Sequence, residues 1–220
     1  MNPSALMKRL LAVVFAIAVF FFILTASIGL PIYIRPFYYA HIDAMDLPHR
    51  SGFTREQIVQ AYDEVLDYLT LPGREFGTGD LAYSESGKDH FVDCKVLFDL
   101  NAGVLVSSFV CIALLLLLRK KFGPYRLGRR SSAFYGAAAA IVLPIVLGSL
   151  AALNFDRAFV IFHSVFFPGK DNWLFDYRTD QIIQVLPQDF FMHCAILIAA
   201  GVVVMSVSVL IWEFVRTKKK

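Results

Sequence analysis

The sequence predicts an all-α membrane protein with four transmembrane helices and a small extracytoplasmic α/β cap. Of its 220 residues, 57% are apolar and 18% are charged, whereas soluble domains average about 45–50% apolar and about 25% charged residues. The apolar residues are concentrated in four long runs, and long polar connections join the first run to the second and the third to the fourth. We therefore expect one integral membrane domain over residues 1–220, in which the polar connections form the cap.

Each apolar run is long enough to cross a bilayer, which takes about 20 predominantly apolar residues. The first run exceeds the roughly 7–15 residues of a signal-peptide core, so we interpret it as a retained helix. The predicted membrane spans are residues 10–30, 100–118, 133–153 and 190–215.

Basic residues predict the orientation of the chain in the membrane. Lys8 and Arg9 precede the first span, six basic residues and no acidic one lie in residues 119–130, and four more end the chain. By contrast, residues 31–99 and 154–189 together hold nine basic and seventeen acidic residues. Because Lys and Arg concentrate in cytoplasmic loops, we expect both termini in the cytoplasm and the cap outside. Topology and contact with anionic membrane lipid account for these basic loops, so we expect no nucleic-acid partner.

The first outer connection, residues 31–99, is too long to be a simple loop. Thr54 and Gln57 have the spacing of a helix capping box, and Pro72 ends the helix that follows. The turn-rich stretch 74–86 predicts a small β-hairpin or a single strand, which gives the cap its β part. The apolar residues of the helix fall on one face: Ile58, Ala61, Tyr62, Val65, Leu66 and Leu69.

The second outer connection, residues 154–189, is dense in aromatic side chains. Aromatic belts are common at membrane interfaces, but these residues fall on one connection rather than at the ends of all four spans. Residues 168–172 form a turn signal, and residues 181–187 predict a strand or a short amphipathic segment. The aromatic residues are Phe159, Phe162, Phe166, Phe167, Trp173, Phe175 and Tyr177.

His90 and Asp93 are the first candidates for chemistry. They are three residues apart, so they share one face if the second helix extends beyond the membrane. A carboxylate in that position can orient an imidazole and stabilise its protonated form. Glu85 is a second candidate partner for His90, and Lys95, which is closer to the membrane, is expected to extend toward the interface.

His163 lies in the segment "VIFHSVFF", where Ser164 is the only polar neighbour. A titratable residue at membrane depth indicates a function, although a neutral ring with one hydrogen bond is the structural alternative. His90 and His163 are both expected near the outer interface, on different segments. Two titratable side chains that meet under an aromatic-rich cap predict a site.

Metal binding is the main competing interpretation of these residues. Two histidines with Asp93 and Glu85 are suitable zinc ligands, but no H-E-x-x-H or paired-cysteine spacing is present. The sequence also lacks a G-x-S-x-G nucleophile motif and a Gly-rich dinucleotide or phosphate loop. We therefore expect acid–base chemistry without a metal or cofactor. A metal-dependent membrane hydrolase and a non-catalytic membrane subunit with a docking cap stay open as alternatives.

The chain resembles the lipoprotein intramolecular transacylases, a family of integral membrane proteins. The resemblance covers most of the chain and rests on "SESGKDHFVDCK" before the second span and on "FHSVFFPGKDNWLFD" and "LPQDFF" before the fourth. The sequence departs from the expected pattern at two positions. Cys94 stands where we expect valine, and Tyr177 stands where we expect proline.

The resemblance implies a specific reaction on bacterial lipoproteins that carry a diacylglyceryl group on their N-terminal cysteine. Such enzymes move the sn-2 acyl chain to the cysteine α-amino group and leave a lyso-form lipoprotein. The two functional histidines of the family match His90 and His163, with Asp93 orienting His90. We expect a monomer whose active site faces the outer leaflet. The expected substrate contacts are Glu85, Lys95, Phe162, Phe166, Trp173 and Tyr177.

Overall fold

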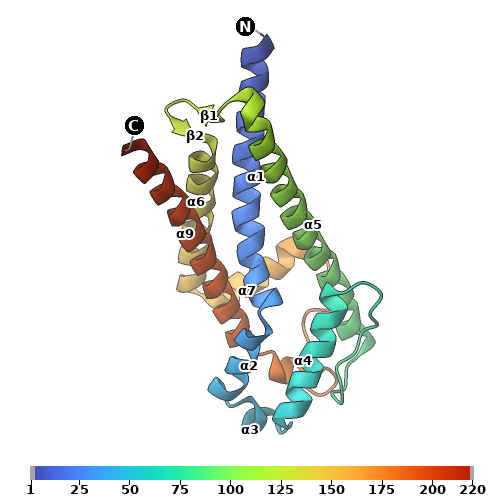
Figure 1. Ribbon diagram of the computed structural model, residues 1–220. Helices are drawn as coiled ribbons and strands as arrows, with labels where there is room; N and C mark the ends of the chain where they lie inside the picture. Colours follow the sequence, from blue (N-terminus) through green and yellow to red (C-terminus); the bar gives the residue numbers. More distant parts are fainter. Residues whose placement is uncertain (1–2, 219–220) are drawn as a thin grey trace. The chain divides into compact units, whose positions relative to one another are not determined.

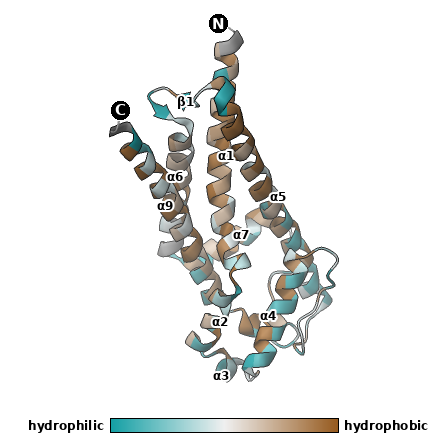
Figure 2. Ribbon diagram, in the orientation of Figure 1, coloured by the Kyte–Doolittle hydropathy of each residue, from teal (hydrophilic) through white to brown (hydrophobic). Residues whose placement is uncertain are grey.

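The computed structural model of the protein describes residues 3–218 and is mostly helical (Figure 1). Four helices are long and apolar enough to cross a membrane, which confirms the predicted fold class at this level. Each predicted span lies within one of them, and Figure 2 shows hydrophobic residues along all four. These helices are α1 (Pro3–Tyr33), α5 (Glu85–Phe122), α6 (Ser132–Leu153) and α9 (Gln188–Lys218).

Helix α5 is longer than a membrane span requires. Its 38 residues correspond to about 57 Å at 1.5 Å per residue, whereas the apolar core of a bilayer is about 30 Å thick. Residues 85–99 carry six charged side chains, and residues 100–118 carry none. Residues 100–118 are thus the part of α5 that is apolar and long enough to cross a bilayer, and the first turns of the helix are charged.

The chain divides into two compact units, which we describe separately. The first comprises Met1–Leu30, Asn101–Ala152 and Ile196–Lys220, and the second comprises Pro31–Leu100 and Leu153–Ala195. Both histidines singled out above belong to the second unit.

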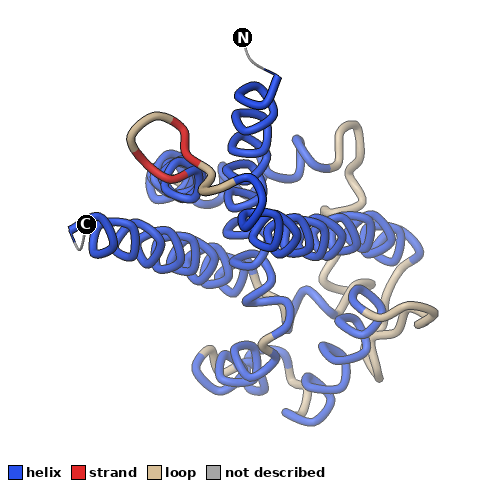
Figure 3. The backbone as a smooth tube through the Cα atoms, turned by 45° about the horizontal axis from the view of Figure 1, so that its top comes forward, coloured by secondary structure: helices blue, strands red, loops and turns tan. Residues whose placement is uncertain are grey.

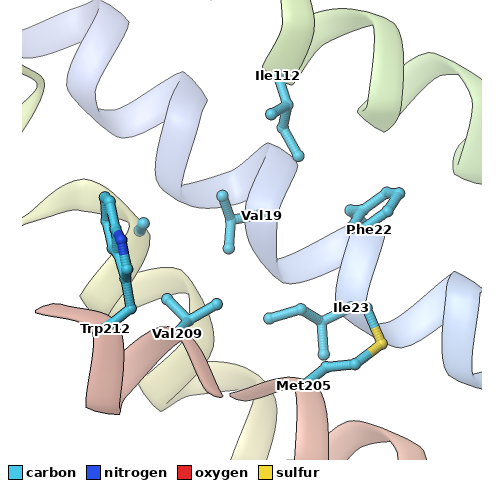
Figure 4. Close-up of a pocket in the computed structure, with 8 residues that line it drawn as sticks. Val19, Phe22, Ile23, Ile112, Met205, Val209 and Trp212 are labelled. Atoms are coloured by element: carbon cyan, nitrogen blue, oxygen red, sulfur yellow. The ribbon is translucent and has the colours of Figure 1, made fainter. Parts of the chain in front are cut away.

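In the first unit, apolar side chains of α1, α5, α6 and α9 form the core. Gly136 of α6 allows a close approach, because an added Cβ would lie 2.4 Å from the carbonyl oxygen of Ala16. This unit contains an apolar pocket of about 280 Å³. Figure 4 shows its lining residues, with Val19 and Ile23 of α1 opposite Val209 of α9. The unit also contains an antiparallel hairpin, drawn red in Figure 3, formed by β1 (Arg126–Leu127) and β2 (Arg130–Ser131).

In the second unit, the predicted capped helix is confirmed as α4. The Thr54 side chain accepts from the backbone N–H of Gln57 at 3.3 Å, and the Gln57 side chain accepts from that of Thr54 at 2.9 Å. All six residues of its predicted apolar face are buried. Tyr62 of this face stacks on Tyr38 at 3.8 Å, and the Tyr38 hydroxyl donates to the carbonyl of Val185. The helices of this unit are α2 (Arg35–Ala44), α3 (Leu47–Ser51), α4 (Arg55–Thr70), α7 (Phe155–Phe166) and α8 (Ile182–Val185).

The β part of the predicted cap is not confirmed. Residues 74–84 have irregular backbone, the segment at 182–185 is the short helix α8, and the strands of the described chain lie between α5 and α6. Side chains accept hydrogen bonds from backbone N–H groups that would pair with a neighbouring strand in a β-sheet. The backbone N–H of Gly79 donates to Glu64, and that of Ala82 donates to the side chain of Gln181, each at 2.7 Å.

Candidate active site

The start of α5 is fixed by a distant carboxylate. The Ser84 hydroxyl caps the helix by accepting from the backbone N–H of Gly87 at 2.9 Å. The backbone N–H and the hydroxyl of Ser84 both donate to Oδ1 of the buried Asp180, each at 2.8 Å. Gly87 makes room for that carboxylate, because an added Cβ would lie 2.1 Å from Asp180 Oδ1. This arrangement sets the height and rotation of His90, which follows within the next turn.

His163 lies on helix α7, in the second long connection, residues 154–189. The Asn154 side chain caps α7 by accepting from the backbone N–H of Arg157 at 2.9 Å. His163 lies in the last turn and is the one residue of α7 that is buried. The carbonyl oxygens at a helix C-terminus favour a nearby positive charge, so this position is suited to an imidazole that gains and loses a proton.

The structure brings His90 and His163 together. Their ring centroids are 5.7 Å apart, and each residue is only 6% exposed. The two residues are 73 positions apart in the chain and come from different helices. Two imidazoles that are both shielded from water and this close together can pass protons to and from one small reacting group.

Aromatic rings enclose the histidine pair. Phe167 lies against both imidazoles, at centroid distances of 4.9 Å from His90 and 5.7 Å from His163. Trp173 stacks on His163 at 4.5 Å with an interplanar angle of 24°, and Phe175 lies edge-on to His90 at 5.5 Å. The rings exclude water from the pair, which strengthens electrostatic effects inside the site.

Hydrogen bonding defines the tautomer of His163 directly. Its Nδ1 lies 2.8 Å from the carbonyl oxygen of Phe159. A carbonyl can only accept, so Nδ1 carries the hydrogen and Nε2 has a free lone pair. His90 differs, because its Nδ1 is buried and has no hydrogen-bond partner among the described residues. The Nε2 of His90 lies 3.4 Å from the thiol of Cys94.

Both imidazoles are held toward the neutral state. Burial and the neighbouring His163 together lower the pKa of His90 to about 4, against an opposing effect of Asp93. Burial also lowers the pKa of His163, although its bond to Phe159 partly opposes this. At neutral pH the site therefore offers two uncharged imidazoles that can act as proton acceptors.

Asp93 is held by two residues of the second connection. Lys170 forms an ion pair with Oδ1, and the side-chain amide of Asn172 donates to Oδ2 at 3.0 Å. Burial would raise the pKa of Asp93, but the hydrogen bonds from Lys170 and Asn172 outweigh it and lower the pKa below its usual value. Asp93 is thus a carboxylate, and Asn172 stands beside both it and His90.

A family model described as lipoprotein intramolecular transacylase Lit matches residues 13–191. The chain belongs to this family. The protein is therefore an acyltransferase, and the family name implies a lipoprotein substrate. Its four apolar helices agree with a multi-pass integral membrane protein. Family membership does not favour the non-catalytic subunit or the metal-dependent hydrolase.

Solved structures of a related transacylase share the fold. The membrane integral transacylase Lit from Bacillus cereus matches with a TM-score of 0.86 and 28% sequence identity, over 98% of each chain. Two variants of that protein with one histidine replaced, by arginine or by alanine, match with TM-scores of 0.80 and 0.81 and the same identity. These matches cover 98% of this chain and 94% and 96% of theirs. A comparison with curated protein sequences finds no match.

The other predicted site residues of the transacylase lie at different distances from the pair. Phe162 contacts His163 at 5.4 Å and Phe166 at 4.6 Å, and both phenylalanines are about half exposed. Tyr177 is 63% exposed, and its carbonyl accepts from Gln184. These three aromatic side chains therefore present open surface on the histidine segment and on the loop that follows it.

Two predicted substrate contacts of the transacylase are engaged elsewhere in the second unit. Glu85 is highly exposed and forms an ion pair with Lys88 at 3.5 Å. Lys95 donates to the carbonyl of Tyr68 at 2.9 Å and lies over the Tyr68 ring. Neither side chain has a hydrogen bond or ion pair to the histidines among the contacts of the described residues.

Lys170, Asn172 and Asp180 are components of the site that the sequence did not single out. Lys170 and Asn172 fall in the stretch "PGKDN", which we interpreted as a turn. The sequence did contain one signal for these residues, because the polar residues 170–172 lie between the aromatic residues of 162–167 and those of 173–177. No group of three or more His, Cys, Asp or Glu side chains in the described part of the transacylase is arranged to hold a metal.

Proposed function

We propose that this transacylase moves the sn-2 acyl chain of a lipoprotein diacylglyceryl group to the α-amino group of the N-terminal cysteine. The observation that carries the proposal is the pair of buried imidazoles, His90 and His163, 5.7 Å apart within an aromatic enclosure. Transfer of an acyl group from oxygen to nitrogen needs a base for the amine proton and an acid for the departing oxygen. Imidazole performs both roles near neutral pH.

The atoms balance without a further reactant. The amine nitrogen attacks the ester carbonyl carbon, a C–N bond forms, and the C–O bond to the glyceryl oxygen breaks. The imidazoles of His90 and His163 accept one proton from the nitrogen and return one to the glyceryl oxygen, so the product is an amide and an alcohol. An α-amino group with a pKa of about 7.7–8.0 is partly uncharged near neutral pH and is able to attack. Asp93 contributes by orienting His90.

Confinement of the substrate supplies much of the rate. Holding two reacting groups of one flexible lipid in contact can lower a barrier by about 7–11 kcal/mol. In our proposal Phe162, Phe166, Trp173 and Tyr177 form the apolar walls that hold the lipid chains. Contacts of Glu85 and Lys95 with the substrate stay predictions.

We also propose that the active site faces the outer leaflet, with both termini in the cytoplasm. The support is the excess of basic residues in residues 119–130 and of acidic residues in 31–99. In this arrangement a monomer takes its lipoprotein substrate from the surrounding membrane lipid. Alkaline phosphatase fused after residue 52 should be active, and the same fusion after residue 128 should be inactive. The reverse pattern would contradict this orientation.

The experiment on the reaction uses the purified protein in lipid vesicles with a synthetic diacylglyceryl lipopeptide. Tandem mass spectrometry must locate the acyl chain, because its transfer within one molecule leaves the total mass unchanged. We expect His90→Ala and His163→Ala each to reduce N-acyl product by at least about 100-fold. His49→Ala is the matched control, since His49 belongs to the same unit and its side chain is 86% exposed. Full product from both active-site variants would refute the proposed roles.

A further inference from the structure

Asn172 has a fixed orientation beside the histidine pair. Its side-chain amide donates to Oδ2 of Asp93 at 3.0 Å, while Lys170 occupies the other carboxylate oxygen. A carboxylate only accepts hydrogen bonds, so the NH₂ group of Asn172 must face Asp93. The carbonyl oxygen Oδ1 of Asn172 therefore points away from Asp93.

Two buried polar atoms beside the histidine pair, one on Asn172 and one on His90, lack hydrogen-bond partners and could bond to each other. Asn172 Oδ1 and His90 Nδ1 are both inaccessible to water, and neither meets the geometry of a hydrogen bond with another described residue. One is an acceptor, and the other is a donor whenever it carries its hydrogen. The Asn172 side chain is also close enough to His90 to raise the pKa of the imidazole, as an acceptor for a ring N–H does.

Two other histidines, His163 and His41, show how a helix can hold an imidazole through Nδ1, whereas Nδ1 of His193, like that of His90, has no hydrogen-bond partner among the described residues. His163 Nδ1 donates to the carbonyl of Phe159, and His41 Nδ1 donates to the carbonyl of Phe37, in each case four residues back on its own helix. His90 forms no such bond through Nδ1, and the contact within its own helix is from Nε2 to the thiol of Cys94 at 3.4 Å. Buried polar groups in native proteins nearly always have a partner, and Asn172 Oδ1 is the complementary unpartnered atom beside this ring.

We propose that Asn172 is a positioning residue that accepts a hydrogen bond from Nδ1 of His90 and thereby links Asp93 to the imidazole. The link runs from the carboxylate of Asp93, through the amide of Asn172, to the ring of His90. It fixes the tautomer in which Nδ1 carries the hydrogen and the lone pair is on Nε2, the nitrogen that lies 3.4 Å from the thiol of Cys94. Phe159 fixes the Nδ1–H tautomer of His163 in the same way. Asp93 thus orients His90 through Asn172, and the catalytic significance of this link rests on the function proposed above.

The test compares three variants in the lipopeptide assay. Asn172→Leu removes the acceptor at similar volume, and we expect kcat to fall by about 10- to 100-fold with KM changed less than about threefold, a part of the 10²–10⁴ that acid–base catalysis contributes. Asn172→Asp keeps an acceptor at Nδ1, so it should retain more activity than Asn172→Leu. Asp171→Ala is the matched control, because Asp171 is the exposed preceding residue of the same turn.

The pH profile separates positioning from a general loss of structure. The titratable groups around His90 are His163, Asp93, Lys170 and Cys94. A carboxylate at position 172 favours the charged imidazole, so Asn172→Asp should move the acidic limb of kcat/KM upward by about one pH unit. Asn172→Leu should not move it upward. Profiles that are identical in all variants would overturn the proposal.

A spectroscopic measurement tests the link independently of turnover. In protein labelled with ¹⁵N-histidine, with the His90 signal assigned from its loss in His90→Gln, we expect the Nδ1–H tautomer in the wild type and a tautomer mixture in Asn172→Leu. If wild-type protein forms no N-acyl product but shows this change, the proposed function fails and the link stands. An unchanged His90 tautomer in a folded Asn172→Leu variant overturns the link, whatever the activity.

Discussion

Replacement of Gly87 by alanine should weaken the start of α5 and the site that depends on it. The added Cβ would lie 2.1 Å from Asp180 Oδ1 and 3.0 Å from the Phe175 ring, so the carboxylate must move. Overpacking of this kind costs about 1–3 kcal/mol, and loss of the Ser84 cap adds about 0.5–2 kcal/mol. Since about 1 kcal/mol shifts Tm by about 2–4 °C at this chain length, we expect Tm to fall by roughly 3–20 °C.

Thermal unfolding of the purified protein in detergent, followed by fluorescence, measures this shift. Gly103→Ala is the matched control, because Gly103 lies in the same helix and an added Cβ there meets nothing within 4 Å. Its Tm should be unchanged or higher, since alanine is favoured over glycine within a helix by about 0.5–1 kcal/mol. A Gly87→Ala variant as stable as Gly103→Ala would refute the idea that Asp180 fixes the helix start.

Four further predictions concern the histidine pair and the neighbouring Cys94. Trp173→Ala removes the ring stacked on His163, so we expect kcat to fall roughly 3- to 10-fold, as loss of an aromatic contact of about 0.5–1.5 kcal/mol implies, and Trp173→Phe to retain most activity. Because burial lowers the pKa of both histidines, the acidic limb of wild-type kcat/KM should lie below the usual histidine value of about 6.5; a limb above it contradicts this. For the same reason the unfolded chain binds more protons below that pH, so Tm should fall from about pH 6.5 toward pH 4, and less steeply in His90→Gln. The desolvated surroundings of the half-buried Cys94 raise the pKa of its thiol to about 12, so maleimide should label it slowly, as followed by peptide mass spectrometry; rapid labelling of folded protein would contradict the raised pKa.

The elements that the sequence predicted correctly are those set by local patterns. The spans follow from run length against bilayer thickness, so residues 10–30 and 190–215 fall within α1 and α9. Helix α4 follows from a capping box and one apolar face, both contained within residues 54–70. Neither inference depends on where the rest of the chain lies.

The parts that could not be predicted depend on distant partners. The turn-rich stretch 74–86 predicted a β-hairpin or a single strand, but residues 74–84 are irregular, and side chains of Glu64 and Gln181 bind their backbone. In the sequence, Asn172 looks like an ordinary turn residue. Its role depends on its hydrogen bond to Asp93, a residue 79 positions earlier in the chain. Lys95 also binds the carbonyl of Tyr68 on α4, and that helix packing has no local signal.

The ion pair of Asp93 with Lys170 explains how a carboxylate can serve a base that must stay neutral. Asp93 alone favours the charged form of His90 and raises its pKa, whereas Lys170 has the opposite effect. Lys170 contacts Asp93 directly and opposes part of its effect on the imidazole, while burial has the largest effect and lowers the pKa of His90. Asp93 can therefore orient the His90 ring through Asn172 while the imidazole stays neutral and able to accept a proton. An isolated carboxylate beside His90 would provide the same orientation but would shift the ring toward the imidazolium that cannot accept the amine proton.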